Sequence, residues 1–193
     1  DRPAFDVPAY SMNSLYEIFI YIILGVLSAG FAVLFIRVLY GTEHFFDKLK
    51  WPLPVKTMLG MVLTGLTILV LPGKEVMGPG LELMNEAIAG DFQIALSMMF
   101  VLLIGKMLAT TFTLGTGNSG GVFAPSLYMG AALGGIVGTI AHQLWPTVVV
   151  HPGAYAIVGM AALFAGAARA PITAILIVFE MTHDFALVPP LML

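Results

Sequence analysis

The amino-acid sequence predicts an all-α fold, a polytopic bundle of membrane helices. Of its 193 residues, 59% are hydrophobic and only 10% are Asp, Glu, Lys or Arg, with a mean hydropathy of +0.97. Soluble domains carry roughly 25% charged residues, so this chain has too few charges for a soluble surface. The composition excludes a soluble enzyme and a disordered segment as leading interpretations. A net charge of −3 offers no basic face for nucleic acid.

The charged residues are clustered, and the uncharged intervals between them predict the membrane spans. Residues 18–36 carry no charge over 19 residues, which gives roughly 28 Å of helix, about one bilayer core. A polar stretch over 41–54 follows, and we expect it to form the loop before a second span over 55–71. Pro72 and Gly73 end that span as helix breakers. Between residues 74 and 91 we expect a loop and a short helix.

The second half of the chain is almost free of charge. A third apolar run covers residues 92–114 and contains Lys106, and the 62 residues between Lys106 and Arg169 include no Asp, Glu, Lys or Arg. Gly and Pro clusters divide this interval, which predicts helices over 124–143 and 154–168. A last helix is expected over 170–181. Such short apolar segments favour half-helices of the kind that transporters place at mid-membrane, although ordinary spans with ragged ends remain an alternative.

A glycine-rich segment over residues 115–125, GTGNSGGVFAP, separates two of these apolar runs. Irregular backbone inside a membrane must lie within protein or line a wet cavity, because unsatisfied polar groups cost several kcal/mol in hydrocarbon. The helix that follows begins with unpaired N–H groups and a partial positive charge. Such an end attracts an anion, and we expect the amides of Val122 and Phe123 to face it. A plain turn between two helices is the alternative.

Four segments in order resemble the CLC family of chloride channels and chloride/proton antiporters. Residues 117–135, GNSGGVFAPSLYMGAALGG, resemble its GxFxP segment. The flanking similarities are KMLAT at 106–110, LPGKEVMGPG at 71–80, and the stretch over 159–184 that contains ARAP and FEMTHD. The family's GSGIP and gating-glutamate segments are not found. The resemblance therefore implies that residues 1–193 are a partial transmembrane domain: the second of two inverted repeats, with tilted and half-length helices, lacking the first repeat and the last helix.

The resemblance also implies a function, a site and partners. The expected protein is a multi-pass protein of the cell membrane that transports chloride, as a voltage-gated-type channel or an antiporter, and neither an enzyme nor dependent on a cofactor. Chloride would be held by backbone amides within Gly121, Val122, Phe123, Ala124 and Pro125. In the family, the helix that matches 170–181 and the next one form a homodimer interface. The candidate contacts are therefore Ile172, Ile175, Leu176 and Phe179.

Other ionisable residues receive plainer interpretations. The histidines at positions 44, 142, 151 and 183 lack metal-ligand spacing, so no metal site is expected. Lys106 is expected to snorkel to an interface or to pair with a carboxylate. Arg169 is interpreted as a membrane-edge anchor, and Glu180 as a structural or interfacial residue. Two alternative functions stay open: transport of another small anion such as fluoride or nitrate, and a non-transporting membrane fragment.

Overall fold

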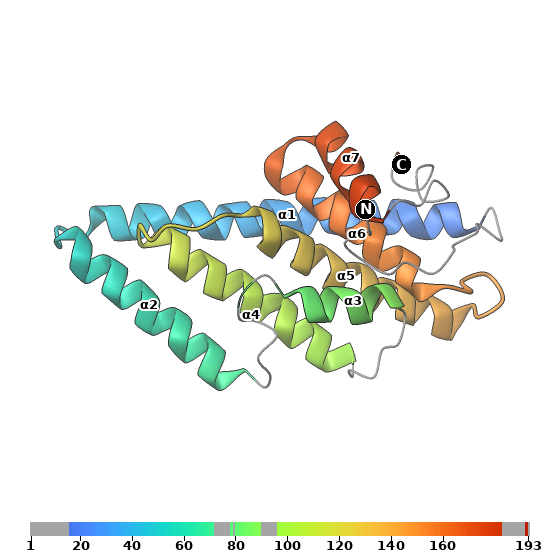
Figure 1. Cartoon of the computed structure of the whole chain (residues 1–193), viewed down its shortest axis with the longest axis horizontal. Helices are drawn as coiled ribbons and strands as arrows, with labels where there is room; N and C mark the ends of the chain where they lie inside the picture. The colour runs from blue at the N-terminus through green and yellow to red at the C-terminus, as the bar shows by residue number, and fades with distance from the viewer. Residues whose placement is uncertain (1–15, 72–77, 79, 90–95, 183–191, 193) are drawn as a thin grey trace.

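Helices account for the regular secondary structure in a computed structural model that describes residues 16–71, 78, 80–89, 96–182 and 192 (Figure 1). The all-α prediction is confirmed. The helices are α1 (Glu17–Lys48), α2 (Leu53–Val70), α3 (Leu81–Ala89), α4 (Leu96–Gly115), α5 (Phe123–Leu144), α6 (Pro152–Ala168) and α7 (Pro171–Thr182).

The first helix is longer than the sequence predicted. The expected loop over 41–54 is wrong, because α1 continues to Lys48 and only a short connection precedes α2. Nothing between Gly41 and Trp51 is a proline, so no residue forces the helix to end there. With 32 residues, α1 is roughly 48 Å long and extends beyond a bilayer core. Its polar end therefore reaches past the apolar layer while remaining helical.

The remaining helix boundaries agree with the predicted segments to within a few residues. By length and composition, α1, α2, α4 and α5 can each cross a membrane, whereas α6 and α7 are shorter apolar helices. The nine residues of α3 and the twelve of α7 correspond to about 14 and 18 Å of helix. Both are too short to span a core of about 30 Å, which confirms the prediction of half-length helices.

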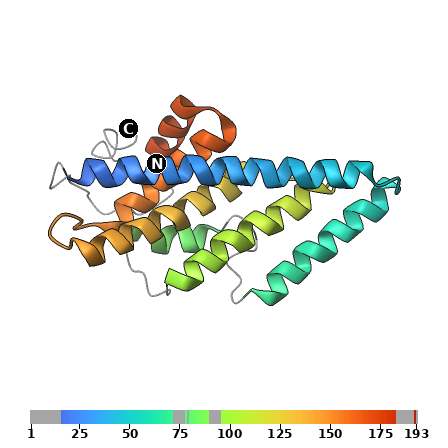
Figure 2. The same ribbon diagram turned by 180° about the vertical axis from the view of Figure 1, so that it is seen from behind.

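The core of the bundle lies between α5 and α6, which pack against each other more extensively than any other pair. Helix α1 runs along α6 and α4, as Figure 2 shows, while α2 packs on α4 and α7 on α6. The α5–α6 contact depends on glycines: a Cβ added at Gly130 would overlap the Gly159 carbonyl and lie 2.6 Å from the Cα of Met160. Small residues that let backbones approach are typical of helix packing in membranes.

Candidate anion site

The glycine-rich segment begins by closing the end of α4. Gly117 has a φ of +88°, a left-handed conformation that favours glycine. It donates its N–H to the Leu114 carbonyl at 3.0 Å, and Asn118 donates to the Thr113 carbonyl at 3.2 Å. The Asn118 side chain also donates to the carbonyl of Thr57 on α2, at 3.2 Å. The first half of the segment is thus fixed to both α4 and α2.

The second half of the segment leaves its backbone donors open. From Ser119 to Ala124, the N–H groups donate to no backbone carbonyl in the described part of the chain. Helix α5 begins at Phe123, Pro125 has no N–H, and the Ser126 amide already bonds the Val122 carbonyl at 3.0 Å. The open donors at the helix start are therefore those of Val122, Phe123 and Ala124, where the helix dipole adds partial positive charge. This arrangement can bind an anion without a charged side chain.

The structure keeps the predicted site residues together at the start of α5. Gly121 and Phe123 are exposed on this chain, and Val122, Ala124 and Pro125 are half-buried. The Phe123 ring packs edge-on against the Phe164 ring of α6, with 5.2 Å between centroids. The last turns of α6 thus hold the first residue of α5 in place.

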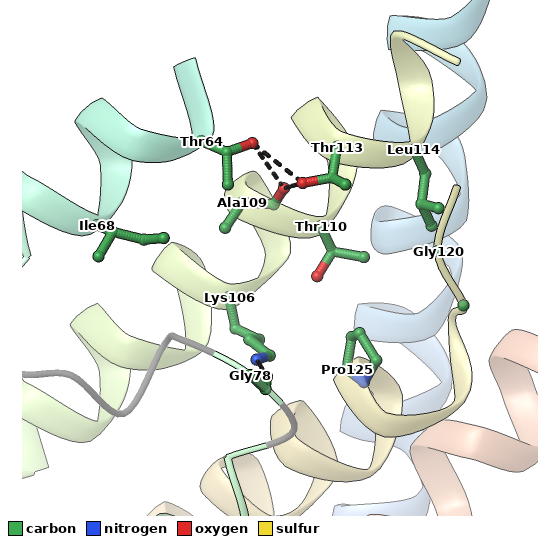
Figure 3. A pocket seen from close by; sticks show the side chains of 11 residues that line it. Thr64, Ile68, Gly78, Lys106, Ala109, Thr110, Thr113, Leu114, Gly120 and Pro125 are labelled. Atoms are coloured by element: carbon green, nitrogen blue, oxygen red, sulfur yellow. Dashed lines mark hydrogen bonds between the residues drawn. The ribbon is translucent and has the colours of Figure 1, made fainter. Parts of the chain in front are cut away.

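A cavity of about 260 Å³ lies beside the same segment and is lined by residues of α2, α4 and the segment itself. Figure 3 shows the side chains around it. The Thr64 hydroxyl lies 3.1 Å from that of Thr113, which donates to the Ala109 carbonyl at 2.8 Å. Among the described residues, its lining comprises Thr64, Ile68, Gly78, Lys106, Ala109, Thr110, Thr113, Leu114, Gly120, Gly121 and Pro125. The glycine-rich segment therefore forms part of the wall of a partly polar cavity.

Lys106 lines this cavity, and the prediction that it snorkels to an interface is wrong. Its side chain is only 4% exposed. The ammonium donates to the Gly78 carbonyl at 2.5 Å and lies 5.0 Å from the centre of the Tyr128 ring. Sequence reasoning missed that a cation lies beside the glycine-rich segment. The signal was present, because Lys106, Thr110 and Thr113 share one face of a helix by their spacing.

The four candidate interface residues on α7 do not share one environment. Ile172 and Leu176 are 73% and 60% exposed, whereas Phe179 is half-buried. Ile175 is half-buried and lines an apolar groove against α1 and α6. Only Ile172 and Leu176, one helical turn apart, form a fully outward pair. The inner face of α7 is made by Ala174 and Val178, which pack into the core.

The other interpreted residues lie away from this site. Arg169 is exposed at the C-terminal end of α6, with a φ of 55°, and Glu180 is exposed on α7. In the part of the chain that the structure describes, no three His, Asp or Glu side chains cluster as metal ligands. His183 lies outside the described residues.

Comparisons with known proteins agree with the resemblance found in the sequence. The family model of the voltage-gated chloride channels matches residues 1–193. The H(+)/Cl(−) exchange transporter ClcA of Vibrio parahaemolyticus is 35% identical over 193 residues, which cover 97% of this chain and 40% of the relative. ClcA of Yersinia pestis is 32% identical over 195 residues, covering 99% of this chain and 40% of the relative.

A solved structure also shares the fold. The crystal structure of a slow cyanobacterial Cl−/H+ antiporter matches with a TM-score of 0.84 and 30% sequence identity, covering 97% of this chain and 44% of that one. The chain thus spans about 40% of the length of the curated relatives described above. The chain is a multi-pass membrane protein and belongs to the voltage-gated chloride channel family.

Proposed function

We propose that this chain forms part of a protein that moves chloride across the cell membrane, as a channel or as a chloride/proton antiporter. The relatives are named for H(+)/Cl(−) exchange. The observation that carries the proposal is the run of open N–H donors from Ser119 to Ala124 at the start of α5. The chloride site comprises Gly121, Val122, Phe123, Ala124 and Pro125, of which the first four belong to this run and supply N–H donors. Residues 1–193 correspond to the second of the family's two inverted repeats.

Backbone donors suit an ion that must be released as well as bound. A helix start contributes roughly half an elementary charge, and conduction needs binding that is favourable yet weak enough for the ion to leave. Such transport requires no covalent step, so the protein needs no cofactor or metal and is not an enzyme.

The test compares two substitutions at one position in the full-length protein. Val122→Ala keeps the N–H and should leave chloride affinity nearly unchanged. Val122→Pro removes the N–H; the φ of Val122 is −90°, close to the proline value, and the preceding glycine tolerates a following proline. Proline at 123 is less suitable, because Val122 has an αR backbone that a following proline disfavours.

Loss of one donor to an anion should weaken binding about tenfold, measured as chloride flux into liposomes and as bromide occupancy in crystals. Equal halide affinity of the folded Val122→Pro and Val122→Ala proteins would refute the amide site. Flux that is selective for fluoride or nitrate, and insensitive to chloride, would assign the same site to another anion.

The protein is further proposed to be a homodimer through α7 and the helix that follows it in the family. Ile172 and Leu176 face outward on α7, and Ile175 and Phe179 flank them. Apolar side chains of this kind are covered either by lipid or by a second subunit, so the oligomeric state decides between them.

A further inference from the structure

One outward face of α1 changes from apolar to basic where the helix leaves the uncharged part of its sequence. The basic half of this face consists of Arg37, Gly41, His44 and Lys48, which follow one another at spacings of four, three and four residues. Such spacing places them on one side of a helix. All four are exposed, and a Cβ added at Gly41 would meet nothing within 4 Å. The described part of the chain therefore leaves this half of the face open.

The apolar half of the same face continues the pattern toward the start of α1. It consists of Ile23, Val26, Gly30 and Val33, again at spacings of three or four residues that run on to Arg37. Ile23, Val26 and Val33 are 56%, 68% and 53% exposed, and a Cβ added at Gly30 would meet nothing within 4 Å. Figure 2 shows α1 in front of the other helices of the bundle. The two halves together form the α1 stripe, which is apolar at one end and basic at the other.

The change of character falls at the edge of the bilayer core. The uncharged run over residues 18–36 is about as long as that core, so Arg37 stands at the level of the lipid headgroups. Tyr40, which is 62% exposed, adds an aromatic ring of the kind that is enriched at membrane interfaces. The acidic residues Glu43 and Asp47 lie beside the stripe rather than on it. The stripe therefore offers basic groups at headgroup level and apolar surface at the depth of the acyl chains.

We propose that the α1 stripe binds an anionic phospholipid, with the lipid phosphate on Arg37 and an acyl chain along the apolar half. A guanidinium binds phosphate through parallel N–H donors. The ring of His44 supplies a further donor, and Lys48 adds attraction to the negative headgroup. Gly30 leaves room for the acyl chain against the helix backbone. The inference goes beyond the proposed function, because a lipid on α1 does not depend on chloride binding at the start of α5.

The test measures lipid binding to the full-length protein in detergent by native mass spectrometry. Phosphatidylglycerol is the anionic probe, and phosphatidylcholine with the same acyl chains controls for apolar contacts. Arg37→Gln removes the charge at headgroup level and keeps a polar side chain. Lys50→Gln is the matched control, because Lys50 is exposed but follows the end of α1 and does not belong to the stripe.

The parent protein and Lys50→Gln should bind phosphatidylglycerol more tightly than phosphatidylcholine. Arg37→Gln should lose about fivefold in affinity for phosphatidylglycerol, the effect of one basic residue near anionic lipid, and should bind phosphatidylcholine as before. Equal binding of the two lipids by the parent protein overturns the inference, and would mean that the rest of the full-length chain or a second subunit covers the stripe. Unchanged affinity in Arg37→Gln, or an equal loss in Lys50→Gln, also overturns it. None of these results bears on the chloride site, which is tested separately at Val122.

Discussion

The close contact between α5 and α6 predicts a large effect from a small change, Gly134→Ala. An added Cβ would overlap the Tyr155 carbonyl oxygen and lie 2.7 Å from its carbonyl carbon and 2.9 Å from the Cα of Ala156. These are backbone atoms of α6, so no side-chain rotation relieves the overlap. The two helices must move apart, and the contacts along their whole interface loosen with them.

The expected magnitude follows from two opposing effects. Forcing extra volume into a packed interior costs about 1–3 kcal/mol, and a rigid backbone obstacle places this site at the upper end. Alanine regains about 1 kcal/mol of helix propensity over glycine. Gly134→Ala should therefore lower the free energy of unfolding by about 2 kcal/mol, which corresponds to a melting temperature lower by about 4–8 °C.

Thermal unfolding in detergent, followed by circular dichroism, measures this shift. The control is Gly30→Ala on α1, where an added Cβ meets nothing within 4 Å. There only the propensity gain remains, so the melting temperature should rise by about 2–4 °C. A Gly134→Ala protein that melts at or above the parent temperature would show that α5 and α6 are not held by backbone contact, and the reasoning would be wrong.

Three further predictions concern single side chains. Arg169→Gly should raise stability by about 1 kcal/mol, since a φ of 55° strains any residue with a Cβ; a lower melting temperature would instead reveal a contact of the guanidinium. Lys106→Met should lower stability by about 2 kcal/mol, because the Gly78 carbonyl loses a charged donor, and unchanged thermal unfolding would contradict this. Leu176→Gln should convert the proposed dimer to monomer in light scattering, whereas Leu66→Gln on α2, 51% exposed, should not; a dimeric Leu176→Gln protein would remove α7 from the interface.

The helices were predictable because membrane composition leaves few alternatives. Uncharged runs bounded by Gly and Pro located the helices to within a few residues, since both residues interrupt the helical hydrogen-bond pattern. The end of α1 was not predictable in the same way. Charge clusters mark where a chain leaves the apolar layer, but a helix ends only where its backbone hydrogen-bond pattern is interrupted. Here α1 ends at Lys48, shortly before Pro52.

The open amides of the glycine-rich segment were predictable from the sequence, whereas the cavity beside the segment was not. The donors at Val122 and Phe123 follow from local rules, because a helix start leaves its first amides open wherever it occurs. The cavity does not follow from them, because it needs Thr64 of α2 to lie across from Thr113 of α4. The face that contains Lys106 and Thr110 is visible in the sequence as helical spacing. What that face meets is decided by tertiary packing.

The absence of Asp, Glu, Lys and Arg between Lys106 and Arg169 has a structural reason that also serves the proposed site. Gly130 and Gly134 allow α5 to contact the backbone of α6, and no charged side chain could be accommodated in so close an interface. The same contact, with Phe123 against Phe164, fixes where α5 begins. Donors held in place before an ion arrives lose little entropy on binding. Gly134→Ala should therefore weaken halide binding as well as stability, although it lies three turns from the open amides. Unchanged halide affinity in that variant would mean that the amides are positioned by the segment itself.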